Sequence, residues 1–252
     1  MKKGRLPFEI LHEDRDVIVI DKPAGLLTTH TKLHGRLARE SQPTAENFLN
    51  DYVRKGQSKS RLRVWLVHRL DRDTSGVMMF AKSEAVAEAM RAKWNEITEK
   101  AYFALVEGEM DSDAGTFESW LKEDADGYRV RSVAPGTPGA KLARTEWRRI
   151  SRKGGDTLVE AVLKSGRKNQ IRVHFADAGH PVVGDTKYGG RKAPRLCLHS
   201  LRLAFVHPAT GRRLAFESAH PAFLWYNITP MSGILASCGT RGGSNAAEGR
   251  GE

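Results

Sequence analysis

The sequence predicts an α+β fold with a mixed, mainly antiparallel β-sheet core flanked by helices. Short runs of β-branched and bulky apolar residues alternate with clusters of Gly, Pro and Asp, which is the pattern of strands separated by turns. A few segments instead repeat their apolar residues every three or four positions, the period of a helix with one face in the core. With 252 residues, the chain is long enough to bury a sizeable core.

Besides the apolar runs at 64–67 and 77–81, which are typical of strands, the first hundred residues carry signals for one further strand and two helices. An apolar run at 16–20 predicts a strand, and Pro and Gly at 23–25 predict the turn that follows it. Residues 43–55 have helical apolar spacing, and Gly56 is a suitable end for that helix. A second helix is expected to begin at the N-cap residue Ser83 and to continue to Trp94.

The second half reads mainly as strands. Residues 100–108 alternate as a strand does, and 111–164 look like a run of short strands separated by Gly-containing turns. Residues 170–178 return to helical spacing. From residue 231 onward the composition shifts to Gly, Ser, Ala and Arg, so we expect a folded domain over 1–230 and a disordered tail over 231–252.

Composition narrows the class of partner. The formal charge of +11 and the isoelectric point of about 9.8 favour a polyanion, most simply nucleic acid. Basic stretches at 31–39, 57–63 and 141–149 are candidates to hold a phosphate backbone. An acidic membrane surface is the alternative, but no basic amphipathic helix is evident, and no apolar run approaches the roughly 18 residues of a membrane span. We therefore expect a cytoplasmic protein.

Cysteine and histidine usage argues against two classes of site. The two cysteines, Cys197 and Cys238, form no Cys-x-x-Cys pair, so neither a disulfide framework nor a zinc ribbon is expected. The nine histidines include no His-Glu-x-x-His or comparable ligand set, so no metal site is expected.

The most informative stretch is residues 68–76, a polar loop between the apolar runs 64–67 and 77–81. A loop held between two core strands is a place where a rigid scaffold presents reactive side chains. The alternative is an ordinary turn, because Asp-x-Thr-Ser-Gly supplies side-chain hydrogen bonds to the backbone and a Gly. The whole stretch resembles the signature of the RluA family of pseudouridine synthases, His-Arg-Leu-Asp-x-x-Thr-Ser-Gly, at every fixed position.

Three further stretches resemble motifs of the same family, and the likeness extends over roughly residues 10–225. Residues 21–25 are similar to the opening of the catalytic domain, and 100–108 are similar to the second motif, Lys-x-Tyr-x-Ala-x-Val-x-Gly. Residues 166–172 are similar to the third motif, Gly-Arg-x-His-Gln-Ile-Arg, except that Asn169 stands where His is usual. Asn keeps the capacity to hydrogen bond but cannot become a cation.

Two other points follow from the resemblance. Many relatives carry an S4-type RNA-binding domain before the first strand; only about fifteen residues precede it here, so a single catalytic domain without that module is expected. Landmarks of the family also recur at 179–185, 188–190 and 198–208. We interpret these as loop and core-strand features and assign no chemistry to them.

The resemblance implies the pseudouridine synthase fold and an isomerase that converts uridine to pseudouridine in ribosomal or transfer RNA. It identifies Asp71 as the catalytic nucleophile and Arg172 as the cation that keeps Asp71 ionised. Tyr102 is the third catalytic residue, which faces the target uracil with a ring for stacking and a hydroxyl that can assist proton removal. Attack on the sugar and attack on the pyrimidine ring both remain open. No metal or organic cofactor is required, and we expect a monomer.

Substrate-binding roles fall to three residues: Arg69, Ile171 and His68. Arg69 is the analogue of the residue that fills the space left by a flipped base, and Ile171 is expected to pack against the uracil.

Two other functions compete with this assignment. A non-catalytic RNA-binding protein would have no need of Asp71, Tyr102 and Arg172 together. A glycoside or nucleoside hydrolase usually uses two carboxylates, and Asp71 and Asp73 are too close in sequence to establish such a pair.

Overall fold

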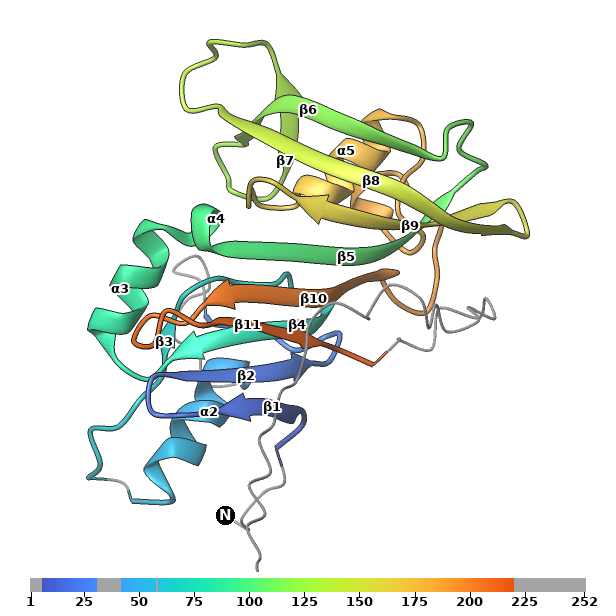
Figure 1. The fold of residues 1–252 in the computed structure, drawn as a ribbon. Coiled ribbons are helices and arrows are strands. Elements are labelled where there is room, and N and C mark those ends of the chain that lie inside the picture. The colour runs from blue at the N-terminus through green and yellow to red at the C-terminus, as the bar shows by residue number, and fades with distance from the viewer. Residues whose placement is uncertain (1–5, 31–41, 58, 220–252) are drawn as a thin grey trace, which may run out of the picture.

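The computed structural model describes residues 6–30, 42–57 and 59–219 (Figure 1). The expectations for the basic loop at 31–39, the tail at 231–252 and Cys238 lie outside the described residues. The strands are β1 (Glu9–Glu13), β2 (Val17–Lys22), β3 (Trp65–Leu66), β4 (Ser75–Ala81), β5 (Thr98–Glu107), β6 (Ala114–Glu123), β7 (Val130–Val133), β8 (Lys141–Lys153), β9 (Asp156–Leu163), β10 (Leu198–Val206) and β11 (Arg213–Glu217). The helices are α2 (Ala45–Arg54), α3 (Glu84–Ala92), α4 (Trp94–Ile97), α5 (Gln170–Asp177) and the 3₁₀ turn η1 (Thr186–Tyr188).

Within this described part, eleven strands form one sheet in the order β1-β2-β4-β10-β5-β9-β8-β6-β7, with β11 paired to β10 and β3 paired to β4. The pairing of β10 with β4 is parallel, and the other strand pairs are antiparallel. The predicted mixed, mainly antiparallel sheet flanked by helices is therefore confirmed. No helix of the described residues is long and apolar enough to cross a membrane.

The central strands are continuous apolar runs because helices cover both faces of the sheet. In β2, Ile18 and Ile20 enter one core cluster together with Leu49 of α2. Val17 and Val19 point to the opposite face, where the second cluster includes residues of α3. Figure 1 shows α2 and α3 beside the β1–β4 end of the sheet and α5 against the β6–β8 end.

The first helix forms as its sequence predicts. Thr44 accepts a hydrogen bond from the Asn47 amide at 3.1 Å and the Asn47 side chain returns to the Thr44 backbone, which completes a capping box. Lys55 takes a left-handed conformation at the other end, and Gly56 follows with φ 76°.

Two expectations about the elements need correction. The helix that begins at Ser83 does not reach Trp94, because Lys93 leaves helical geometry at φ −118° and ψ 15° and a separate short helix follows. The strands of 111–164 are not all short, since β8 has 13 residues and pairs with both β6 and β9.

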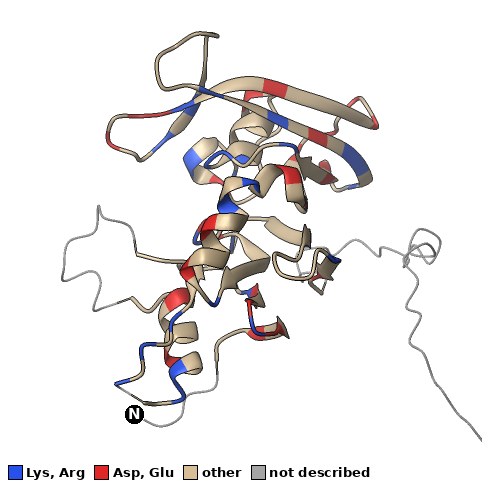
Figure 2. Cartoon of the chain, turned by 60° about the vertical axis from the view of Figure 1, so that its left-hand side comes forward, with Lys and Arg blue, Asp and Glu red and all other residues tan. Residues whose placement is uncertain are grey.

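The basic surface expected at 141–149 is balanced by acidic side chains. Arg148 Nε lies 2.5 Å from Glu160 Oε2, and Arg144 lies 3.4 Å from Glu146 and 3.8 Å from Glu118. Figure 2 accordingly shows Lys and Arg interspersed with Asp and Glu along the upper strands. The alternation of β8 did place Arg side chains outward, but the neighbouring strands supply their counter-charges, which the segment alone does not reveal.

Two histidines are held neutral inside the fold. His68 accepts a hydrogen bond from the Met79 amide at 3.1 Å and stacks on Trp94 with ring centroids 4.6 Å apart. Burial, with a smaller contribution from the Lys100 charge, lowers the pKa of His68 to about 3. His174 lies between Thr145 Oγ1 at 2.9 Å and Ser119 Oγ at 3.1 Å, and burial lowers its pKa to about 4, partly opposed by Asp177.

These histidines predict acid lability. Below the ordinary histidine pKa of 6.5, the unfolded chain binds protons that the folded protein does not, so stability falls as the pH falls. We expect the free energy of unfolding in urea to decrease below that pH by about 1 kcal/mol per pH unit for each histidine. The His174→Gln variant should show about half the decrease between pH 6 and 5, because it removes one of the two titrations. A free energy that is constant over this range would contradict the prediction.

Candidate active site

A pocket of about 450 Å³ lies where the loop before β4 meets β5 and the start of α5. It brings together five of the six predicted site residues, which come from three distant segments of the chain: Arg69, Asp71, Tyr102, Ile171 and Arg172. The sixth, His68, does not line the pocket.

His68 requires a correction. Its ring stacks on Trp94, and its Nε2 is occupied by the Met79 amide, so it supports the signature loop from the core side. The neighbouring Arg69 is exposed and turns toward the pocket. Successive side chains of an extended segment point to opposite sides, which explains why two adjacent signature residues separate in this way.

The backbone of the signature loop is held by the end of β2. Lys22 is fully buried, and its Nζ donates to the carbonyl oxygens of Leu26 at 2.8 Å, Pro23 at 3.0 Å and Arg72 at 3.0 Å. The Gly25 amide donates to the same Arg72 carbonyl at 2.9 Å. One buried ammonium therefore joins the turn after β2 to the loop that carries Asp71.

The signature ends in glycine for a steric reason. Gly76 has φ 109°, and a Cβ at this position would lie 2.1 Å from the Ser200 carbonyl oxygen. Strand β10 approaches β4 closely here through their parallel pairing, with Gly76 opposite Ser200. Any side chain would push β10 away, and Tyr102 lies opposite Ser200 on the other edge of β10.

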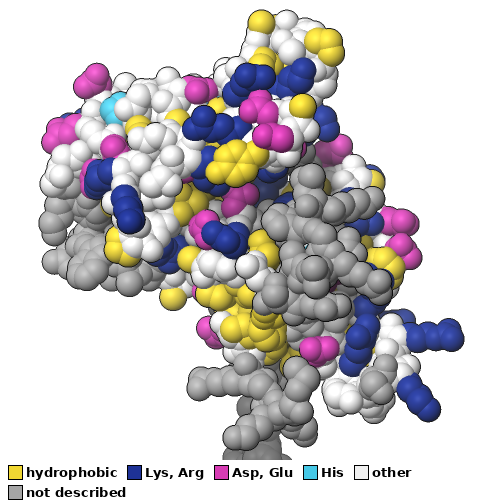
Figure 3. Space-filling view, turned by 180° about the vertical axis from the view of Figure 1, so that it is seen from behind, with side chains coloured by type: hydrophobic (Ala, Val, Ile, Leu, Met, Phe, Trp, Pro, Cys, Tyr) yellow, Lys and Arg dark blue, Asp and Glu magenta, His cyan; other side chains and the backbone are white. Residues whose placement is uncertain are grey.

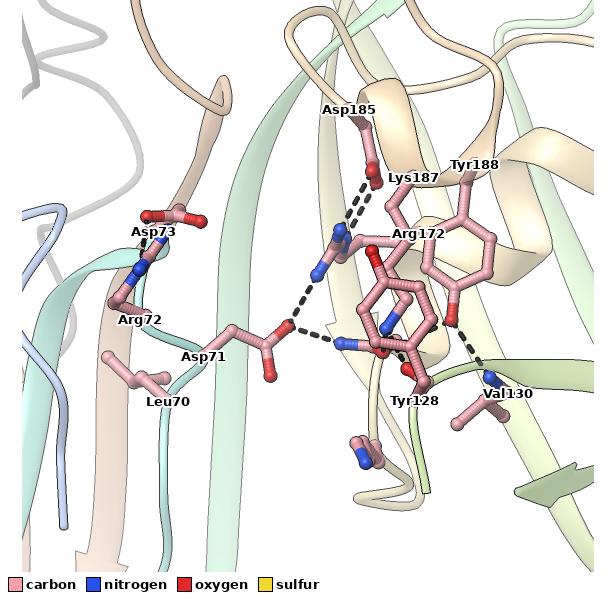
Figure 4. Close-up of polar contacts among 12 residues, drawn as sticks. Leu70, Asp71, Arg72, Asp73, Tyr128, Val130, Arg172, Asp185, Lys187 and Tyr188 are labelled. Carbon is pink, nitrogen blue, oxygen red and sulfur yellow. Dashed lines mark hydrogen bonds and ion pairs between the residues drawn. The ribbon is translucent and has the colours of Figure 1, made fainter. Parts of the chain in front are cut away.

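Asp71 stands at the centre of a charged network (Figure 4). Its Oδ2 accepts hydrogen bonds from Arg172 Nη1 at 3.1 Å and from Asn169 Nδ2 at 2.6 Å. Within the described residues no hydrogen bond reaches its other oxygen, Oδ1. Hydrogen bonds thus hold Oδ2 of the carboxylate, and Oδ1 is available to a substrate.

Arg172 is positioned by a second carboxylate. Its Nε and Nη2 donate to the two oxygens of Asp185 at 2.6 Å and 2.7 Å, a bidentate pair. The Asp185 side chain is fully buried and that of Arg172 is 12 % exposed. Burial alone would lower the pKa of Arg172, but the hydrogen bonds and charges of Asp185 and Asp71 raise it above its ordinary value. The guanidinium therefore stays charged and keeps one orientation.

Asn169 supplies the second donor to Asp71. It precedes α5 in a left-handed conformation, φ 53° and ψ 19°, which Asn tolerates better than most residues. Its Oδ1 accepts from Tyr188 OH at 3.1 Å and from Lys187 Nζ at 3.2 Å, so its Nδ2 is turned toward Asp71. An uncharged amide thus donates a hydrogen bond where the family motif usually carries His.

Tyr102 forms one wall of the pocket from the middle of β5. It is buried, and burial, together with the nearby charge of Asp71, raises its pKa to about 12 against the opposing effect of a hydrogen bond with Ser200. Its phenol is therefore protonated at neutral pH. Ile171, in the first turn of α5, adds a second buried apolar surface.

Sequence reasoning missed Asp185, Lys187 and Tyr188. Asp185 and Tyr188 belong to stretches interpreted as loop and core-strand features, and Lys187 lies between those stretches. A single Asp after the apolar pair 182–183 is a weak signal for a charged network. The spacing of thirteen residues between Arg172 and Asp185 does not indicate an ion pair. Only the fold brings η1 against the start of α5.

Comparisons with known proteins identify the family of the chain. Residues 16–177 match the family model described as RNA pseudouridylate synthase. The chain is 34 % identical over 219 residues to the uncharacterized RNA pseudouridine synthase YjbO of Bacillus subtilis, covering 86 % of this chain and 74 % of that protein. It is 31 % identical over 240 residues to ribosomal large subunit pseudouridine synthase C of Vibrio cholerae, covering 91 % and 71 % respectively.

The fold agrees as well. The structure of human RNA pseudouridylate synthase domain containing 4 superposes with a TM-score of 0.66 at 23 % identity, covering 85 % of this chain and 89 % of that one. The family model covers more than half of the chain, and both curated relatives are at least 31 % identical over more than two thirds of their own length. The chain belongs to the RNA pseudouridylate synthase family and is an isomerase that acts on RNA.

Proposed function

We propose that this enzyme isomerises uridine in ribosomal RNA, with Asp71 as the nucleophile and with the target base flipped out of its stack into the pocket. The observation that carries the proposal is the Asp71–Arg172–Asp185 network at the pocket. A binding protein has no need of a carboxylate held by one oxygen and open at the other. The choice of ribosomal RNA follows the relative named as a large-subunit synthase.

The reaction breaks the bond between N1 of uracil and C1′ of ribose, rotates the base, and joins C5 to C1′, with loss of the proton at C5 and gain of a proton at N1. Oδ1 of Asp71 is available to attack, while Arg172 and Asn169 hold Oδ2. The hydrogen bonds from Arg172 and Asn169 keep the carboxylate in one orientation. Attack on C1′ of the sugar and attack on C6 of the ring are both compatible with this arrangement.

The freed uracil must be held while it turns. Tyr102 and Ile171 offer the aromatic and aliphatic surfaces for this task, and Leu163 and Leu198 also line the pocket. The raised pKa of Tyr102 makes its anion scarce at neutral pH, so we assign Tyr102 to stacking and hydrogen bonding and not to proton removal. The C5 proton is taken by the Asp71 carboxylate once it has been released from the substrate.

Access to this pocket requires the target nucleotide to leave its helix or loop stack. Arg69 is exposed at the pocket and carries a planar guanidinium that can stack and hydrogen bond in the vacated space. No metal or organic cofactor takes part in these steps. Action on ribosomal RNA would place the protein in the cytoplasm.

The test uses transcripts of large-subunit RNA, small-subunit RNA and transfer RNAs that carry tritium at uracil C5. Incubation with the purified full chain should release tritium to water from large-subunit RNA, because pseudouridine formation removes the C5 proton. Release from transfer RNA alone would reject the proposed substrate while keeping the activity. Free uracil in the product would instead indicate a hydrolase.

A further inference from the structure

An exposed aromatic side chain stands at the edge of the active site. Tyr128, in the loop between β6 and β7, is 65 % exposed, the largest exposed fraction among the large hydrophobic residues of the described chain. Figure 4 shows its ring in front of Lys187 and Tyr188, across from Asp71. In the space-filling view from behind, hydrophobic side chains are visible among Lys and Arg on the upper part of the molecule (Figure 3).

Hydrogen bonds hold the backbone of the loop that carries this ring. The Tyr128 amide donates to Asp126 Oδ1 at 2.8 Å, and the Gly127 amide donates to the Asp124 carbonyl at 2.8 Å. The Asp124 amide closes the loop on the Arg129 carbonyl, also at 2.8 Å. Lys187 Nζ donates to the Tyr128 carbonyl from the other side. A ring displayed in this way loses little conformational freedom when a planar partner stacks on it.

Two cations lie beside the tyrosine rings at this edge of the site. Lys187 Nζ lies 4.6 Å from the centroid of the Tyr128 ring, and Arg129 lies 5.7 Å from that of Tyr188. In the part of the chain that the structure describes, neither forms an ion pair with a carboxylate, whereas nearby Lys168 and Arg172 pair with Glu123 and Asp185. Burial and the charges of Arg172 and Lys168 lower the pKa of Lys187. This positive charge is the kind that a phosphate neutralises.

Tyr128 is linked to the Asp71 carboxylate through Lys187 and Asn169. Lys187, which contacts the Tyr128 ring, also donates to Asn169 Oδ1 at 3.2 Å. Asn169 in turn donates to Asp71 Oδ2 at 2.6 Å. The side chains from Tyr128 to Asp71 therefore form one contiguous wall that begins in the pocket and ends in solvent.

We propose that Tyr128, Lys187 and Arg129 form a subsite for a nucleotide next to the target uridine, in which the Tyr128 ring stacks on the base and the two cations hold its phosphate. This rests on the proposed function, because it requires a uridine in the Asp71 pocket. Stacking accepts any base, so the subsite favours a nucleotide whose base is unstacked and not a particular sequence. The substrate class implied is a single-stranded or bulged RNA segment around the target.

The first experiment measures KM and kcat for tritium release from the large-subunit transcript. Tyr128→Ala should raise KM by roughly 5- to 100-fold, the range of base–aromatic stacking, with a much smaller change in kcat. Tyr128→Phe should retain most of the affinity and Tyr128→Leu should not, because only Phe keeps a flat ring. Tyr52→Ala is the matched control, since Tyr52 is a 40 % exposed tyrosine on α2 and should leave both constants unchanged.

An unchanged KM in the Ala and Leu variants would reject the subsite, and so would a fall in kcat alone, which would indicate a positioning role through Lys187.

Arg129→Gln should weaken binding and reduce its dependence on salt, as the loss of a phosphate contact does. If the wild type releases no tritium from any RNA, the proposed function fails, and the subsite is tested separately with a ten-nucleotide oligouridylate. Equal binding of that oligonucleotide by the wild type and Tyr128→Ala would then reject it.

Discussion

Replacing Asp71 by Ala or Asn is expected to abolish tritium release while RNA binding stays within about threefold of the wild type. Loss of a nucleophile typically lowers the rate by at least roughly 10³-fold, and the other binding groups remain. The Asn variant is the more informative of the two, because its amide oxygen can still accept from Arg172 and Asn169. The Arg172 guanidinium keeps its bidentate partner Asp185, so the fold should persist.

The chain offers a matched control two residues away. Asp73 is half exposed and pairs with Arg72 at 3.1 Å, and it does not line the pocket. Asp73→Asn should therefore retain nearly full activity. If Asp71→Asn remains active while Asp73→Asn does not, the assignment of the nucleophile is wrong. If both are inactive, a two-carboxylate mechanism becomes the better explanation.

Replacing Asp185 by Ala is expected to lower both stability and activity. The Asp185 side chain is fully buried, and its removal leaves the guanidinium of Arg172 in a largely buried position without its bidentate partner. Breaking a buried ion pair in this way typically costs about 3–5 kcal/mol in the free energy of unfolding. The activity should fall as well, because Arg172 loses the orientation that holds Asp71.

Two further variants separate these effects. Arg172→Met in the Asp185→Ala background removes the unpaired charge, so the free energy of unfolding in urea should partly recover while the activity does not. Asp113→Ala removes the 81 % exposed partner of Arg149 and should change stability by less than about 1 kcal/mol. A loss in Asp185→Ala no larger than that of Asp113→Ala would show that the buried pair does not stabilise the fold.

The strands and helices were largely predictable because their signals are local. The first four residues of β2 are apolar on both faces of the sheet because helices cover both faces there. The ends of α2 were predictable because capping depends on residues within one turn of the helix. The break at Lys93 was not, because Trp94, the first residue of the separate helix α4, stacks on His68, which comes from a different segment.

Within the site, the sequence by itself identified the residues whose chemistry is carried by contiguous motifs: Arg69, Asp71, Tyr102, Ile171 and Arg172 all reach one pocket. The tertiary structure alone decided what surrounds them. It placed His68 against Met79 and Trp94, turned Asn169 toward Asp71, and put the buried Asp185 behind Arg172. The physical reason is that the free energy of a charged group depends on its burial and on partners that are far away in the chain. Neither the burial nor the partners of a residue can be read from the spacing of residues in the sequence.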